Sequence, residues 1–145
     1  MYDSLSEVCD YLETYLNAGQ NSLGLARPVI YSDTNVAVRF PCVQMIPEAK
    51  VREWQYAGGG LERGLIKRFR VQLFVMHANL QMNKPLRSKA NIAKAEEVSS
   101  YLDADYTLGG NIIQGWVTAE DFTLLPTPKG QAVVATRLTW EGESR

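Results

Sequence analysis

This 145-residue sequence has no long apolar run and no pattern of a secretory signal. Its uninterrupted apolar runs are only a few residues long, well short of the roughly 20 needed to cross a bilayer. The residues that follow Met1 lack the basic and apolar regions of a signal peptide, so we expect synthesis in a reducing cytoplasm. We therefore expect no association with a membrane.

Residues typical of metal sites and of nucleophilic catalysis are also scarce. Cys9 and Cys42 lie far apart, with no CxxC motif and no histidine beside them, so we expect two buried thiols. His77 is the only histidine, and its place in an apolar strand favours a structural or interface role. Asp103 and Asp105 lack the spacing of a calcium loop and fit a helix-end turn. We expect no catalytic site, no metal and no cofactor.

An excess of charge of one sign is absent as well. Fifteen basic residues against sixteen acidic ones leave a formal net charge of -1, which offers no bulk attraction to nucleic acid or to anionic membrane. The composition is 46% hydrophobic and 21% charged, which is ordinary for a globular protein. Length and composition together predict one domain over residues 1–145, with one core.

What the sequence does contain is a series of periodic segments that predict an α+β fold. The first is a helix with a capping box of Ser4 and Glu7, and the second is a helix from about Pro85 to Tyr101. The order α-β-β-β-β-α-β-β predicts an antiparallel or mixed sheet packed against two helices. The final two strands, joined by a Pro-Gly loop, should form an antiparallel pair, and residues 141–145 look loose. Strands are expected at 28–32, 36–45, 51–56, 64–77, 111–119 and 131–140.

The longest strand candidate runs from Gly64 to His77. Its fourteen residues, at about 3.3 Å each, would span roughly 45 Å, more than one domain of this length needs for its own sheet. The strand is entered from 51–56 through the triplet Gly58, Gly59 and Gly60. This arrangement predicts a long projecting hairpin whose glycine tip docks on a partner.

The two faces of this strand differ in character. The odd positions around Phe69 are apolar and should face the core. The even positions carry Arg68 and Arg70, which should face solvent or a partner, and then Phe74 and Met76, which should lie beneath a helix. Because Phe69 points away from the arginines, a contact with protein fits this strand better than a nucleic-acid platform.

The second helix has an unusual order of charge. Basic residues, among them Arg87 and Lys89, precede the acidic Glu96 and Glu97, an order that opposes the helix macrodipole. A solvated face is one interpretation. The other is a head-to-tail contact between copies, basic end against acidic end. The expected apolar stripe of this helix is Ile92, Ala95, Val98 and Leu102.

The candidate positions for an interface with another copy or with a partner combine the hairpin and this helix. They are Gly58, Gly59, Gly60, Glu62, Arg63, Lys67, Arg68, Arg70, Arg87, Lys89, Glu96 and Glu97.

A family resemblance covers nearly the whole chain. It rests on the N-terminal helix, the strand Phe40-Pro41-Cys42-Val43, the hairpin into Arg68-Phe69-Arg70-Val71-Gln72-Leu73-Phe74-Val75, the second helix, Leu108-Gly109-Gly110 and the closing strands. In these features the chain resembles the tail terminator proteins of long-tailed bacteriophages, small α/β subunits that form a ring, commonly a hexamer.

The resemblance implies a structural virion protein without catalysis. Such a ring would sit in the tail or neck, at the head-proximal end of the tail tube, end tube polymerisation and join the tail to the head. The implied partners are other copies of the chain, the tail-tube protein and a head-side connector or stopper, with DNA only as passing cargo in the lumen. Assembly would take place in the host cytoplasm.

Three alternatives remain open from the sequence. The chain resembles other neck and tail-tube ring subunits too, because related folds occur there. A small nucleic-acid-binding module would use the basic strand around Arg68. An enzyme would require His77, or Asp103 with Asp105, in a cleft.

Overall fold

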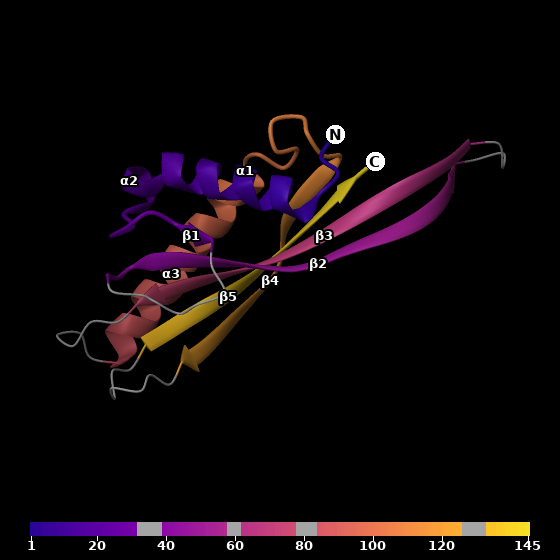
Figure 1. Ribbon diagram of the computed structural model, residues 1–145. Helices are drawn as coiled ribbons and strands as arrows, with labels where there is room; N and C mark the ends of the chain where they lie inside the picture. The colour runs from indigo at the N-terminus through magenta and orange to yellow at the C-terminus, as the bar shows by residue number, and fades with distance from the viewer. Residues whose placement is uncertain (32–38, 58–61, 78–83, 126–132) are drawn as a thin grey trace.

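A five-stranded mixed sheet with helices on one face forms the framework of the protein (Figure 1). The computed structural model describes residues 1–31, 39–57, 62–77, 84–125 and 133–145. The sheet order is β1-β2-β3-β5-β4, with β1 parallel to β2 and all other pairs antiparallel. The α+β class and the order of elements confirm the prediction. In the described chain the elements are α1 (Leu5–Ala18), α2 (Gln20–Leu23), β1 (Ile30–Tyr31), β2 (Cys42–Ala57), β3 (Glu62–His77), α3 (Lys84–Asp103), β4 (Gln114–Leu125) and β5 (Val133–Ser144).

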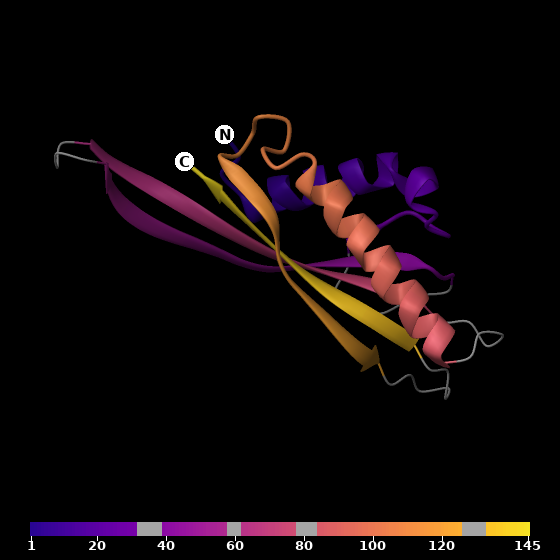
Figure 2. The same ribbon diagram turned by 180° about the vertical axis from the view of Figure 1, so that it is seen from behind.

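The main core lies between the sheet and the two long helices, which cover the same face (Figure 2). The predicted capping box is present, because the Ser4 side chain accepts from the Glu7 N–H and the Glu7 carboxylate accepts from the Ser4 N–H. Full burial of each large apolar side chain stabilises the fold by about 1.5–3 kcal/mol. Core residues from the sheet include Met45, Phe69, Val71, Leu73, Val75, Leu138 and Trp140, and those from the helices include Val8, Leu12, Leu16, Ala95, Val98 and Leu102.

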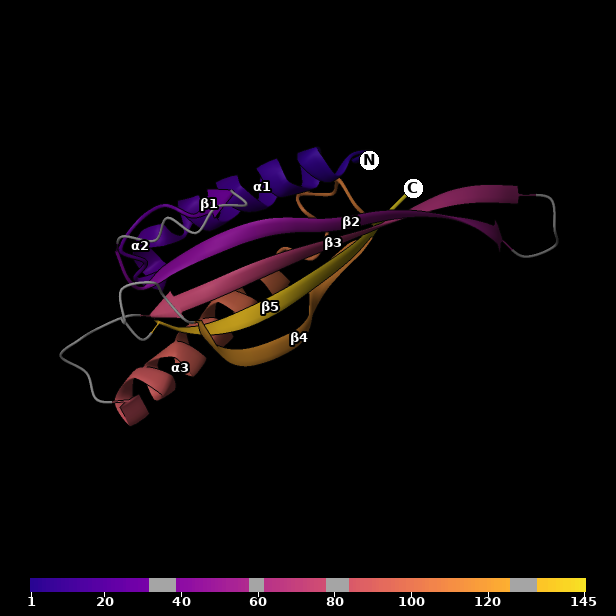
Figure 3. The same ribbon diagram turned by 60° about the horizontal axis from the view of Figure 1, so that its bottom comes forward.

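The predicted projecting hairpin is confirmed. β3 pairs with β5 only from Lys67 to His77, and β1 pairs with β2 only at Gln44 and Met45. In the described chain, residues 53–57 and 62–66 therefore pair with each other alone. This two-stranded extension, which we call the ribbon, runs past the rest of the sheet for roughly 16 Å (Figure 3). The triplet Gly58, Gly59 and Gly60 lies outside the described residues.

The strands expected at 36–45 and 51–56 are parts of one strand, β2. The described part of the first begins at Cys42, after Pro41, rather than running through the proline. A β-bulge shifts the register between Pro47 and Ala49, and pairing with β3 continues on both sides of the bulge. One bulged strand therefore replaces two separate ones.

Two expectations about side-chain position are wrong. Phe74 and Met76 do not lie beneath a helix; they occupy the helix-free face, in a second apolar cluster with Cys42 and Ala135. Strict alternation along β3 requires this, because Phe69 and Val75 already point toward the helices.

On α3 the predicted apolar stripe holds at Ala95, Val98 and Leu102 but not at Ile92, which is 44% exposed. The fully buried Asn91 takes the core-facing position instead. Asn91 can be buried there because its side-chain amide forms hydrogen bonds with polar groups of the sheet.

The C-terminal segment 141–145 is not loose. β5 continues to Ser144, whose hydroxyl donates to the Tyr2 carbonyl at 2.5 Å, so the two ends of the chain lie side by side (Figure 1). Hydrophobic patterning misses this because Glu141, Gly142 and Glu143 read as polar loop, whereas their pairing with β3 and β4 makes them a central strand. A further short helical turn, α2, follows α1 directly.

Candidate interaction surface

Alternation divides Lys67, Arg68 and Arg70, three of the basic residues of β3, between the two faces of the sheet. Arg68 and Arg70 lie on the helix-free face, and Lys67 lies on the helix side. The sequence places all three in one candidate interface. The structure instead gives two surfaces, back to back on the same strands.

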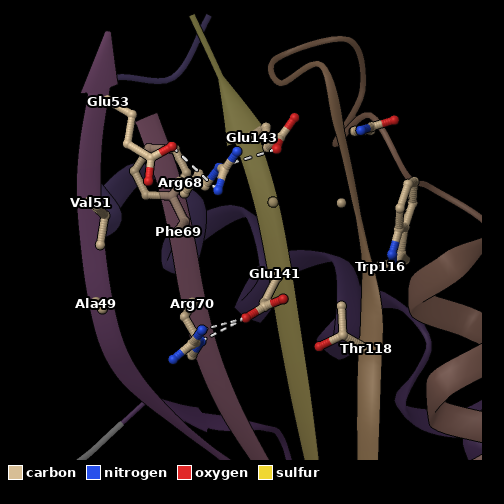
Figure 4. A pocket seen from close by; sticks show the side chains of 13 residues that line it. Ala49, Val51, Glu53, Arg68, Phe69, Arg70, Trp116, Thr118, Glu141 and Glu143 are labelled. Carbon is tan, nitrogen blue, oxygen red and sulfur yellow. Dashed lines mark hydrogen bonds and ion pairs between the residues drawn. The ribbon is translucent and has the colours of Figure 1, made fainter. Parts of the chain in front are cut away.

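On the helix-free face, each arginine lies between carboxylates of the neighbouring strands (Figure 4). The Arg68 guanidinium is 3.3 Å from Glu53 of β2 and 3.3 Å from Glu143 of β5. Arg70 donates from both Nε and Nη2 to Glu141 Oε1 at 2.7 Å. Cross-strand pairing brings these charges together, since Arg68 is opposite Glu143 and Arg70 is opposite Glu141 in the register.

A groove of about 460 Å³ lies among these side chains, and we call it the acidic groove. Its charged lining is Glu53, Glu141 and Glu143 with Arg68 and Arg70, and Trp116 of β4 forms the opposite wall (Figure 4). Trp116 is 45% exposed, so its ring is accessible from solvent. The volume lies within the range of about 300–1,000 Å³ typical of ligand clefts.

The acidic groove carries more negative than positive charge. A fourth carboxylate, Glu48, lies 4.0 Å from Arg70 and accepts from Gln72 at 2.5 Å. The three carboxylates and two guanidiniums that line the groove give a formal charge of -1, and Glu48 beside it brings the formal charge of this surface to -2. Phosphate binding requires uncompensated cations, so this surface does not favour a nucleic-acid backbone.

The helix side of the same strands carries the opposite charge. The Lys67 ammonium forms an ion pair with Asp3, and the Lys50 ammonium donates to the Asp3 carbonyl. Hydrogen bonding and attraction from Lys67, together with Lys50 and Arg52, lower the pKa of the Asp3 carboxyl below its usual value. Lys50, Arg52, Lys67 and Asp3 form what we call the basic face, with a formal charge of +2. Arg52 is exposed and opposite Lys67 in the register.

Sequence reasoning missed most of these residues. It named Lys67 but neither Asp3 nor Lys50, because 47 positions separate them and nothing local links them. It also missed Trp116 and the acidic partners of the arginines. The available signal was that Glu141 and Glu143 have the same two-residue spacing as Arg68 and Arg70. This spacing identifies the partners only when the register of β3 with β5 is known.

The remaining predicted positions are dispersed. Lys89, Glu96 and Glu97 are exposed on α3, whereas Arg87 is only 6% exposed and does not present its charge at the surface. Lys94 is 2.8 Å from Glu97, so part of the charge order of α3 is satisfied locally. Glu62 and Arg63 are paired in the ribbon with Ala57 and Tyr56.

His77 and its neighbours form a buried polar network beneath α3. The Asn91 amide donates to the Val75 carbonyl at 2.7 Å, lies 3.0 Å from His77 Nδ1, and accepts from the Thr136 hydroxyl at 2.7 Å. Burial lowers the pKa of His77, with a smaller contribution from Lys94. The histidine thus takes part in helix–sheet packing.

The two aspartates also make structural bonds. Asp105 accepts from the Tyr11 hydroxyl at 2.5 Å and from the Gly109 N–H at 2.9 Å, where Gly109 has a φ of +67°. Asp103 accepts from the Val117 N–H at 3.0 Å. Each carboxylate therefore ties a different segment to the end of α3.

Cys9 and Cys42 are both buried, and burial raises the pKa of the Cys42 thiol. Among the residues that the structure describes, no group of three His, Cys, Asp or Glu side chains could hold a metal ion. In that same part of the chain, no helix has the length and apolar character needed to span a bilayer.

Fold and surface together define a small α+β protein with a projecting ribbon and two oppositely charged faces. No protein-family model matches the chain, and no curated protein matches it.

Proposed function

We propose that this protein is a structural ring subunit at the head-proximal end of a bacteriophage tail tube. There it ends tube polymerisation and joins the tail to a head-side connector. The observation that carries the proposal is the ribbon, which leaves the sheet and pairs with no other described strand of its own chain. The resemblance to tail terminator proteins supplies the setting.

A projecting two-stranded ribbon is costly for an isolated subunit. Two strands without a third strand or a covering helix are marginally stable in water, so the ribbon gains most of its stabilisation from a neighbour. A contact between a ribbon and a different surface of the next copy is heterologous, and repetition of such a contact closes a ring when the rotation allows it. This reasoning supports self-assembly in place of catalysis.

The same observation supports a second candidate, a different ring subunit of the neck or the tail tube. Both candidates place the chain in the virion, with DNA passing through the lumen. They differ in what stops growth: a terminator binds the end of a tube and blocks further addition, whereas a tube subunit adds to itself. Carboxylates beside Arg68 and Arg70 count against the nucleic-acid-binding alternative.

The test is the mass of the purified protein by native mass spectrometry over a concentration series, alone and with tail-tube subunits. We expect a closed ring, either alone or at the end of the tube, and tubes that stop growing when it is added. A monomer that ignores the tube at every concentration would overturn the proposal. Tubes that incorporate it along their length would favour the tube-subunit candidate.

A shortened ribbon provides the matched variant. Trp54 and Leu65 are opposite each other in the register, so residues 55–64 can be replaced by the two-residue turn Asn-Gly. We expect this variant to fold, because it keeps the strands that pair with β5, and to lose ring formation. A shortened protein that still forms the ring would remove the ribbon from the argument.

A further inference from the structure

The acidic groove and the basic face lie on opposite faces of the same two strands. Arg68, in the groove, and Lys67, in the basic face, are consecutive residues of β3. On β2, Val51 lines the groove and Arg52 belongs to the basic face. The formal charges of +2 and -2 are therefore separated by little more than the thickness of one sheet. Such a subunit is polar across its sheet.

We propose that the basic face of one copy seats against the acidic groove of the next. This inference rests on the proposed ring, and it names the two surfaces that meet. The occupant is a second copy because the two surfaces are opposite in sign, whereas the whole chain is close to neutral at -1. Complementary surface charge steers association and fixes the register of the contact.

The residues beyond Arg52 in the ribbon reinforce this choice. In the register, Trp54 and Tyr56 follow Arg52 at two-residue intervals and are opposite Leu65 and Arg63. Tryptophan, tyrosine and arginine are the residue types enriched at interface hot spots. By register, the residues that follow Arg52 along the ribbon are therefore of the types that protein interfaces favour.

The groove has a shape that suits this occupant. About 460 Å³ admits a few side chains, not a whole ribbon. The exposed ring of Trp116 stands beside Glu141 in the register, so a guanidinium entering the groove meets an aromatic face and carboxylates together. Arg52 has the charge and the exposure to enter it.

Two variants test the two surfaces separately. Arg52→Glu reverses the exposed charge of the basic face, and Trp116→Ala removes the wall of the groove. We expect each to weaken self-association of the full chain at least roughly tenfold. Arg39→Glu is the matched control: it makes the same change in charge at an exposed residue outside both surfaces, and self-association should be unchanged. Raising the salt concentration should weaken the wild type more than Arg52→Glu.

Mixing the variants asks whether the two surfaces meet each other. Arg52→Glu keeps an intact groove, and Trp116→Ala keeps an intact basic face. An equimolar mixture should therefore give a 1:1 dimer and nothing larger, whereas each variant alone stays monomeric. A mixture that remains monomeric would overturn the inference, because the surfaces would then have different partners.

The remaining outcomes separate this inference from the proposed function. If both variants form the wild-type ring, the inference is overturned and the ring proposal stands. If Arg39→Glu weakens association and Arg52→Glu does not, the contact lies outside the two surfaces and the inference is overturned. A wild-type protein that stays monomeric alone also overturns it, while capping of tail tubes decides the proposed function. Arg52→Gln, which removes the charge without reversing it, gives the same comparison if Arg52→Glu does not fold.

Discussion

Replacing Gly142 with alanine should destabilise the protein through one side chain, Trp140. Both residues lie in β5 on the helix side of the sheet, and the indole extends over the glycine. A Cβ added at Gly142 would lie 2.4 Å from Trp140 Cη2 and 2.9 Å from Cζ3. Both distances are shorter than real Cβ atoms tolerate, so either the ring or the strand must shift.

The size of the effect follows from how little room the ring has. Trp140 is fully buried, and Gly115 of β4 is equally close to it, with an added Cβ at 2.3 Å from Cζ2. Overpacking of a filled core costs about 1–3 kcal/mol, and this contact belongs at the upper end. Alanine reduces the entropy of the unfolded chain, which returns about 0.4–1 kcal/mol. We expect a net loss of roughly 2–2.6 kcal/mol, or a fall in Tm of about 8–10 °C.

Urea unfolding followed by circular dichroism and by tryptophan fluorescence measures this loss. The control is a double-mutant cycle in which Gly142→Ala is made with Trp140→Phe, because the smaller ring leaves space for the new methyl group. Alanine should then cost less in the phenylalanine background. A stability within about 0.5 kcal/mol of wild type, or equal costs in the two backgrounds, would refute the steric argument.

Three further changes test the polar contacts of the core. Asn91→Ala should lower the free energy of unfolding by about 2–4 kcal/mol, because it leaves buried groups such as the Thr136 hydroxyl without their amide partner; urea unfolding checks this. Burial lowers the pKa of His77 below 6.5. The contribution of His77 to stability is therefore complete above pH 6.5 and is lost as the pH falls toward its folded pKa. His77→Gln should flatten the dependence of the unfolding free energy on pH between about pH 5 and about pH 7. The bond to Asp105, followed by burial, raises the pKa of Tyr11 to about 12, so stability should fall as pH rises from about 10 to 12, and Tyr11→Phe should remove that fall in a thermal-unfolding series.

Strong periodicity made the main elements predictable. The helix after Ser4, the apolar odd positions of β3 and the pairing of β4 with β5 all follow from local patterns that the tertiary structure reinforces. The ribbon was also predictable, because its length exceeds what one domain requires and a glycine triplet separates its strands. Fold class and overall shape therefore follow from the sequence.

The charge of the two faces did not follow from the sequence alone. Lys67, Arg68 and Arg70 read as one basic cluster until register shows that carboxylates from two other strands compensate the arginines. Asp3 joins the basic face only because the N-terminus packs against the sheet. The sign of the charge on each surface depends on ion-pair partners that lie tens of residues away in the sequence. Local sequence patterns do not reveal these partners.

β5 is synthesised after the other elements described here, yet it lies in the interior of the sheet, between β3 and β4. A nascent chain that ends before Val133 therefore carries β4 without its partner and lacks Glu141 and Glu143 of the groove. Unpaired strands of this kind are prone to aggregation. The order of translation therefore has a structural consequence: the chain acquires its acidic groove only when β5 is available to complete the sheet.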